Sequence, residues 1–161
     1  MSISSENIRI VSAKDSESLA EVHKKCFDDG WSAESFFNML SSDVFFGFVY
    51  EKSSIDGFII GKIVCDEVEI ITFCVIPQFR NQGIGGALIK RVHNYAASRS
   101  ASKIFLEVAE DNAAARKLYE NLGYKKIAER KEYYNTKEGQ KNATVMEKAL
   151  RKDDQTFAAA L

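Results

Sequence analysis

The residues best suited to chemistry lie in one glycine-rich loop, between a predicted strand and a predicted helix. The loop runs from Pro77, the only proline, to Gly86, and it holds three of the nine glycines. Glycine permits positive φ angles and lets a ligand approach the main chain closely. Free N–H groups at a helix start favour an anion. The loop therefore predicts a phosphate or pyrophosphate ligand, to which Arg80 could add a positive charge.

Two well-known phosphate-binding motifs do not fit this loop. A P-loop requires Gly-Lys-Ser/Thr at its end, whereas Gly86 is followed by Ala87 and Leu88. The dinucleotide fingerprint requires a third glycine after two spacer residues behind the Gly83-x-Gly85 pair, and that position is Leu88. The alternative interpretation, a glycine-rich helix start without a ligand, stays open at this point.

The elements that must position this loop follow from hydrophobic periodicity. Strands are predicted at residues 8–11, 44–51, 58–65, 67–76, 103–109, 124–134 and 143–150, and helices at 16–27, 33–40, 87–96 and 113–121. This order predicts an α/β (α+β) fold with a mixed sheet of about seven strands and helices on both faces. Residues 1–150 are expected to form a single domain, and residues 151–161 a disordered tail.

The composition argues against several classes of protein, among them nucleic-acid-binding, secreted, membrane and metal-binding proteins. The net charge of −1 comes from interspersed acidic and basic residues, which argues against a nucleic-acid partner. Residues 1–6 are polar and the apolar runs are short, so we expect no secretory signal, no membrane partner and a cytoplasmic location. The three cysteines match no zinc spacing, and His23 and His93 lie on separate helical stripes, so no metal site is expected.

The stretch Arg80-Asn-Gln-Gly-Ile-Gly85, with Val75-x-Pro77 before it and Leu88 after it, resembles the Arg/Gln-x-x-Gly-x-Gly/Ala motif of the GNAT superfamily of N-acetyltransferases. A second block, Leu106-Glu-Val108 followed by a segment from Asn112 to Tyr124, resembles the strand–helix unit of the same superfamily. The resemblance covers nearly the whole chain in element order. It implies the GNAT fold and acetyl-CoA as cosubstrate.

The resemblance also assigns cofactor-binding residues. The amide of Val75 would polarise the thioester carbonyl, and the side chains of Asn112 and Tyr119 would approach the pantetheine and the thiol. The pyrophosphate would bind the loop, through Arg80, Gln82, Gly83, Gly85, Gly86 and Ala87.

In its details the chain most resembles the bacterial RimI group, the ribosomal-protein alanine N-acetyltransferases. That resemblance implies direct transfer to the N-terminal α-amine of a protein, with a ribosomal protein as a candidate partner. Two departures lie near the expected acceptor site: Gly30 rather than proline precedes Trp31, and Thr72 stands where that group often has asparagine.

Glu107 and Tyr119 are the predicted catalytic residues. Glu107 shares a strand face with Phe105 and Ala109, and a carboxylate there could accept the amine proton, directly or through a water. The alternative is a structural glutamate bonded to a basic side chain. Tyr119 could protonate the departing thiolate, and its alternative is packing. The predicted acceptor-binding residues are Trp31, Glu69 and Tyr134.

Two other functions remain open at the level of the sequence. The first is acetylation of a small amine or a lysine side chain, which would favour an acidic pocket, although the acceptor side reads as more aromatic than acidic. The second is a non-catalytic coenzyme A-binding regulator.

Overall fold

The computed structural model describes residues 3–136 and 139–150, except the side chains of residues 132 and 134–136. The expected tail, 151–161, lies outside the described residues. The strands are β1 (Ile8–Ile10), β2 (Phe45–Glu51), β3 (Ile55–Val64), β4 (Glu67–Val75), β5 (Lys103–Ala109), β6 (Lys125–Thr136) and β7 (Gly139–Ala149). The α-helices are α1 (Ser16–Cys26), α2 (Ala33–Leu40), α3 (Ile84–Ser98) and α4 (Ala113–Asn121). Short 3₁₀ turns are η1 (Ser5–Asn7), η2 (Ala13–Asp15) and η3 (Pro77–Phe79).

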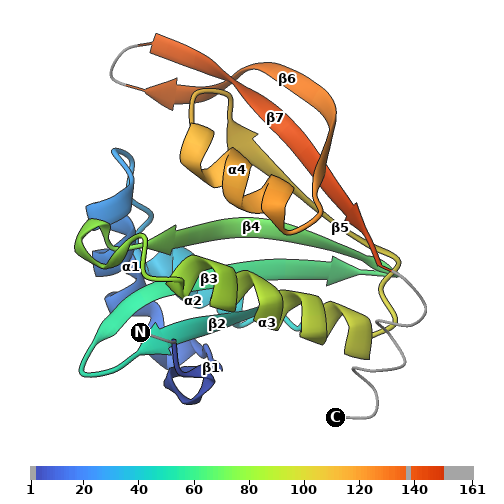
Figure 1. Cartoon of the computed structure of the whole chain (residues 1–161). Helices are drawn as coiled ribbons and strands as arrows, with labels where there is room; N and C mark the ends of the chain where they lie inside the picture. Colours follow the sequence, from blue (N-terminus) through green and yellow to red (C-terminus); the bar gives the residue numbers. More distant parts are fainter. Residues whose placement is uncertain (1–2, 137–138, 151–161) are drawn as a thin grey trace.

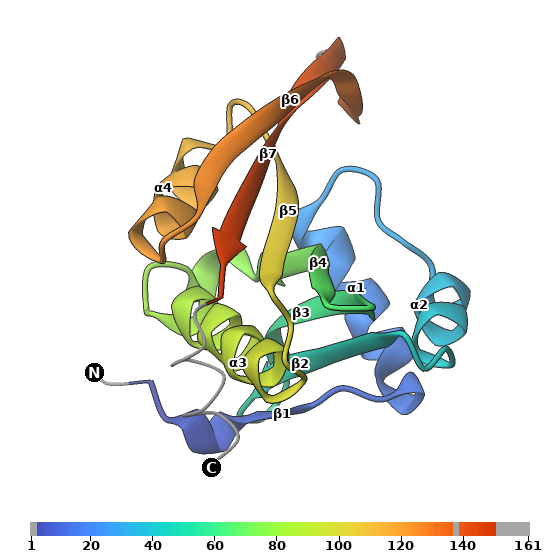
Figure 2. The same ribbon diagram turned by 90° about the vertical axis from the view of Figure 1, so that its right-hand side faces the viewer.

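All strands belong to one seven-stranded sheet of order β1-β2-β3-β4-β5-β7-β6. Only the β4–β5 pair is parallel, and the other neighbours are antiparallel. α3 and α4 lie on one side of the sheet, and α1 and α2 on the other (Figures 1 and 2). The predicted mixed sheet with helices on both faces is confirmed.

Two buried clusters hold these layers together. On the α3 and α4 side, Leu88, Ile89 and Val92 of α3 pack on Ile104 and Leu106 of β5, and all are at most 1% exposed. Burying each such side chain contributes about 1.5–3 kcal/mol. On the opposite side, a second cluster joins the two other helices to β3 through Leu19, Phe36 and Phe58.

Helix boundaries follow local capping. Ser32 and Asn112 accept hydrogen bonds from the backbone N–H groups of Ser35 and Ala115 at the starts of α2 and α4, as their types predict. Asp15 is the N-cap residue of α1, but its side chain does not cap the helix, because its carboxylate accepts hydrogen bonds from Nη2 of Arg9 at 2.9 Å and from the amide of Ser12.

The feature that shapes the site is the divergence of β4 and β5. Their described register ends at Ile70 opposite Leu106, although β4 continues to Val75 and β5 to Ala109. β4 also carries a bulge at Ile71, because Ile60 pairs with Thr72 while Gly61 pairs with Ile70. Figure 1 shows the two strands together at one end of the sheet and apart at the other. Residues 71–75 of β4 and 107–109 of β5 are therefore not paired with each other, and the gap between these two backbone segments is named the opening.

Candidate active site

The loop Arg80–Gly83 turns the chain from β4 into α3. Gly83 is the N-cap residue with φ of 89°, a conformation that costs a residue with a side chain roughly 1–2 kcal/mol. Its carbonyl accepts the amide of Ala87 at 3.1 Å, which closes the first turn of α3. The amides of the first turn before Ala87 have no partner within the helix. They form a ready site for an anion.

Gly85 and Gly86 face different surroundings at this helix start. A Cβ atom on Gly85 would lie 3.0 Å from the ring of Phe73 and 3.4 Å from the side chain of Leu118. A Cβ atom on Gly86 would meet nothing within 4 Å. Gly85 therefore lets α3 pack against β4 and α4, whereas Gly86 leaves open space through which a ligand could reach the main chain.

Arg80 and Gln82 make hydrogen bonds to the backbone. The Nε of Arg80 donates to the carbonyl of Val75 at 2.9 Å, and the Nε2 of Gln82 donates to the carbonyl of Gln78 at 3.4 Å. Arg80 thus ties the loop to the end of β4, a positioning role that its residue type alone did not indicate. Beside Gln82 and Gly83 lies a hollow of about 610 Å³.

The end of β4 presents backbone donors to the opening. The amide of Ile76 donates to the carbonyl of Asp56 on the β3 side at 2.9 Å. Because hydrogen-bonded and non-bonded positions alternate along an antiparallel pair, Val75 and Phe73, opposite Gly57 and Ile59, direct their N–H groups away from β3. Both amides therefore point towards the opening, where an oxyanion could be stabilised.

Tyr119 of α4 lies on the α3 side of this opening. It is 4% exposed, and its ring meets that of Phe73 with centroids 6.2 Å apart and that of Tyr124 at 5.5 Å. Tyr124 pairs its hydroxyl with Nε2 of His93 at 2.9 Å, and burial raises the pKa of Tyr124 far above its ordinary value. Asn112 caps α4 nearby with its Oδ1. The ring of Tyr119 is therefore fixed by aromatic packing.

Glu107 lies on the opposite face. Its neighbours Leu106 and Val108 point into the α3-side cluster, so the side chain of Glu107 points towards the α1 side. It comes directly after Leu106, the last residue of β5 in register with β4. Glu107 therefore lies where the two strands begin to diverge, on the opposite face of the sheet from Tyr119.

An ion pair engages Glu107. Nη1 of Arg130 lies 2.7 Å from its Oε1, with side-chain exposures of 54% for the arginine and 18% for the glutamate. The guanidinium carbon of Arg130 stacks 4.0 Å from the ring centre of Tyr133. Tyr133 comes close because the β6–β7 register shifts between Arg130 and Tyr134. Burial and the charge of Glu107 raise the pKa of Tyr133 above its ordinary value.

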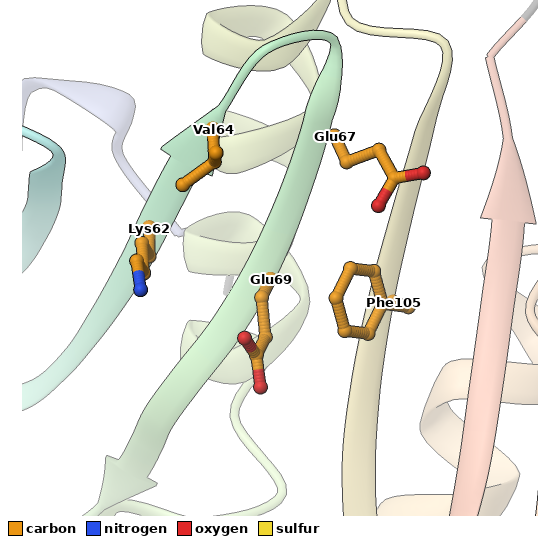
Figure 3. Close-up of a pocket in the computed structure, with 5 residues that line it drawn as sticks. All are labelled: Lys62, Val64, Glu67, Glu69 and Phe105. Carbon is orange, nitrogen blue, oxygen red and sulfur yellow. The ribbon is translucent and has the colours of Figure 1, made fainter.

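Glu69 lies beside Glu107 on this face. Register places Glu69 opposite Phe105, one side-chain repeat before Glu107. Figure 3 shows its carboxylate between Lys62 of β3 and Phe105 of β5, in a shallow hollow of about 80 Å³. Burial, followed by the charge of Glu107, raises the pKa of Glu69 above the ordinary glutamate value. Two carboxylates on adjacent strands could bind a cation such as an ammonium group.

Comparison with protein-family models matches residues 16–124 to the acetyltransferase (GNAT) family. The chain belongs to the GNAT family. The ribosomal protein bS18-alanine N-acetyltransferase of Escherichia coli K12 is 33% identical over 60% of this chain and 65% of that protein. The corresponding protein of Haemophilus influenzae is 30% identical over 84% of this chain and 93% of its own length. Among solved structures, the Escherichia coli ribosomal-protein-S18-alanine N-acetyltransferase superposes with a TM-score of 0.81, at 27% identity over 88% of this chain and 93% of that chain.

In this GNAT fold the predicted residues fall into three groups. The first group lies on β4, on β5, on the loop and start of α3, or on α4 and its cap: Val75, Arg80, Gln82, Gly83, Gly85, Gly86, Ala87, Asn112, Tyr119, Glu107 and Glu69. Trp31 belongs to the second group, because it stacks on buried His23 with centroids 5.0 Å apart and packs against the α1-side cluster. The side chain of Tyr134 lies outside the described residues.

Phe73 and Arg130 of this GNAT site were not predicted from the sequence, which also favoured Tyr134 over its neighbour Tyr133. Phe73 precedes Val75 by one strand repeat, so the alternation of strand positions could have indicated it. Arg130 is the kind of basic partner that the alternative interpretation of Glu107 allowed, but the sequence did not single it out. Tyr133 comes close through an irregularity in β6 that residue types do not reveal.

Among residues 3–136 and 139–150, no group of three or more His, Cys, Asp or Glu side chains could hold a metal ion. Over the same residues, no helix combines the length and the apolar character needed to span a bilayer.

Proposed function

We propose that this GNAT chain transfers the acetyl group of acetyl-CoA to the N-terminal α-amine of a protein by direct attack. One observation carries the proposal. The opening between β4 and β5 has two outward-directed amides, with a tyrosine on one face and a carboxylate on the other. The two reactants could therefore enter from opposite faces and meet in the centre of the sheet.

The loop and the start of α3 would bind the donor. The free amides of the first turn favour the pyrophosphate of acetyl-CoA, and the open space at Gly86 admits it. The amides of Phe73 and Val75 are candidates to hold the pantetheine and the thioester carbonyl. One of them would stabilise the oxyanion that forms when the amine attacks, an effect that a single donor typically provides at about 2.7–4 kcal/mol.

The two proton transfers would take place on opposite faces of the sheet, one at Glu107 and the other at Tyr119. Glu107 accepts a proton from the acceptor ammonium, directly or through a water, and the freed amine forms the new C–N bond. As the tetrahedral intermediate collapses, the C–S bond breaks and Tyr119 donates its proton to the departing thiolate, while the attacking nitrogen releases its second proton to solvent, from which Tyr119 is reprotonated. Glu107 and Tyr119 thus have separate roles, and no covalent acetyl-enzyme is needed.

The charge around Glu69 and Glu107 bears on the acceptor. The two carboxylates favour a cationic acceptor. Arg130 pairs with one carboxylate, and the charge of Lys62 acts on the other. The near balance of charge favours an acceptor with one ammonium group over a polyamine, which would require an excess of carboxylates.

The relatives support a protein acceptor. The bacterial relatives are named for the alanine of ribosomal protein bS18, so a ribosomal protein is the first candidate partner, and its acetylation would take place in the cytoplasm. A lysine side chain or a small amine is the second candidate. An acetylation assay with free and blocked peptides separates these acceptors, because only an α-amine enzyme requires a free N-terminus.

A further inference from the structure

Glu107 has a cationic partner within the protein itself. The 2.7 Å contact with Arg130 places a cation at the carboxylate on the open side of the site. An acceptor ammonium carries the same charge and would pair with the same carboxylate. Arg130 and the acceptor therefore compete for one carboxylate.

Arg130 has a second favourable contact, with the ring of Tyr133. Its guanidinium already lies 4.0 Å from the ring centre of Tyr133, which is 43% exposed, and a cation over an aromatic face is favourable. Arg130 could leave Glu107 by a change of its own rotamers and remain stacked on Tyr133. Because the arginine is itself exposed, breaking the pair costs little compared with a buried pair.

Taking acetyl transfer to an amine as the function, on which this inference rests, we propose that Arg130 is a cationic placeholder that the acceptor ammonium replaces at Glu107. In the resting enzyme Arg130 neutralises the carboxylate. The incoming ammonium displaces it onto Tyr133, while Glu69 lies alongside the exchanged cation.

The same exchange would help the product leave. Acetylation converts the charged amine into a neutral amide, which no longer competes as a cation for Glu107. Arg130 then pairs with Glu107 again and displaces the product. The loss of the ammonium charge thus drives the return of Arg130 to Glu107. Arg130 is a positioning residue, because it contacts the carboxylate and not the amine or the acetyl group.

Arg130→Gln tests this directly, with Lys131→Gln as the matched control. Lys131 is the next residue on β6, is exposed, and loses the same charge. We expect Arg130→Gln to lower the acceptor KM by about two- to fivefold, the range for an exposed ion pair, and to lower kcat because product release slows. Arg130→Lys retains a cation and should keep the wild-type KM. Lys131→Gln should change neither constant.

Chemical rescue sharpens the test. Millimolar methylguanidinium should refill the vacated place in Arg130→Gln and raise KM and kcat towards wild type, whereas sodium at equal ionic strength should not. A fall in kcat with an unchanged or higher KM would overturn the placeholder, because it would mean that Arg130 only holds Glu107 in position.

A binding measurement in the absence of acetyl transfer tests the placeholder separately from the proposed function. Titration of a free N-terminal peptide into the enzyme with coenzyme A gives a Kd, which should fall by the same factor in Arg130→Gln. The peptide with a blocked N-terminus should show no such gain. If peptides bind with this pattern but no amine is acetylated, the proposed function fails and the placeholder stands. An unchanged Kd, or no binding, overturns the placeholder.

Discussion

The rings of Tyr119 and Phe73 meet edge to face, with centroids 6.2 Å apart, and this contact fixes α4 to the diverging end of β4. Phe73 in turn lies 3.0 Å from where a side chain on Gly85 would begin. The tyrosine, the strand end and the start of α3 therefore form one packed unit around the opening. Edge-to-face pairs of this kind contribute about 0.5–1.5 kcal/mol beyond their buried area.

Tyr119→Phe should retain acetyl-CoA binding and lose rate. The ring contacts stay, but the hydroxyl that would protonate the thiolate is gone, so kcat should fall about 10²-fold. Steady-state kinetics and a binding titration measure the two effects. Tyr124→Phe is the matched control, since it removes a neighbouring hydroxyl whose partner is His93. It should cost about 1 kcal/mol of stability with little change in kcat. Turnover of Tyr119→Phe within about twofold of wild type would contradict the acid role.

Glu107→Gln should lower kcat by about 10²–10⁴-fold at neutral pH, because the amide cannot accept the ammonium proton. Glu67→Gln is the control on the same sheet face, where Glu67 pairs with Lys103 at 3.1 Å. It should remain active. The alternative structural role of Glu107 makes a different forecast: Glu107→Gln and Arg130→Gln would then have equal, small effects on rate.

Gly85→Ala and Gly86→Ala should differ in kind. The first must push aside Phe73 and Leu118, so it should weaken acetyl-CoA binding and reduce thermal stability. The second adds a methyl group to open space inside α3 and should stabilise the free protein by about 0.4–1 kcal/mol. If Gly86→Ala also leaves acetyl-CoA affinity unchanged, the cofactor does not approach the backbone there.

Acceptor binding should weaken as the pH falls through the raised pKa of Glu69. Burial and Glu107 favour its protonated form, so its charge is lost at a higher pH than the ~4.3 of a free glutamate. Glu69→Gln should raise the acceptor KM about fivefold at pH 7.5, as expected for a partly exposed ion pair. It should also remove this component of the KM profile below neutral pH. An unchanged KM in Glu69→Gln would exclude the residue from acceptor binding.

His23 should make folding stability depend on acid pH. Burial lowers its pKa to about 4, and its Nδ1 accepts the backbone N–H of Trp31 at 3.1 Å, which requires the neutral ring. In the unfolded chain the pKa of His23 is about 6.5. The stabilisation that requires the neutral ring is therefore present above pH 6.5 and is lost as the pH falls towards 4. Urea unfolding at several pH values measures it. His23→Phe should be less stable at pH 7 but show a flatter dependence, and an equally steep dependence would assign it to other groups.

The elements could be predicted because their patterns are local. Alternating burial in β5 and the Asn112 cap of α4 depend on neighbouring residues, and both are observed. The loop at Gly83 could also be predicted, because glycine is the residue that adopts a positive φ without strain, and Gly83 has such a φ.

The parts that could not be predicted depend on contacts distant in sequence. Arg130 reaches Glu107 across 23 positions, and no local pattern indicates that pair. Tyr133 owes its place to the irregular β6–β7 register, whereas the sequence favoured Tyr134. Trp31, predicted at the acceptor, packs on His23, because an aromatic ring beside a helix finds core partners as readily as a ligand.

The central claim is most directly tested by incubating the purified protein with acetyl-CoA and a peptide that begins with a free alanine. The same peptide with a blocked N-terminus and an internal lysine is the control, and spermidine is a third acceptor. Thiol release and product mass measure transfer. The account predicts one acetyl group on the free α-amine and none on the blocked peptide. Acetylation of the blocked peptide or of spermidine alone would contradict the proposed acceptor, and failure to bind acetyl-CoA would contradict the function itself.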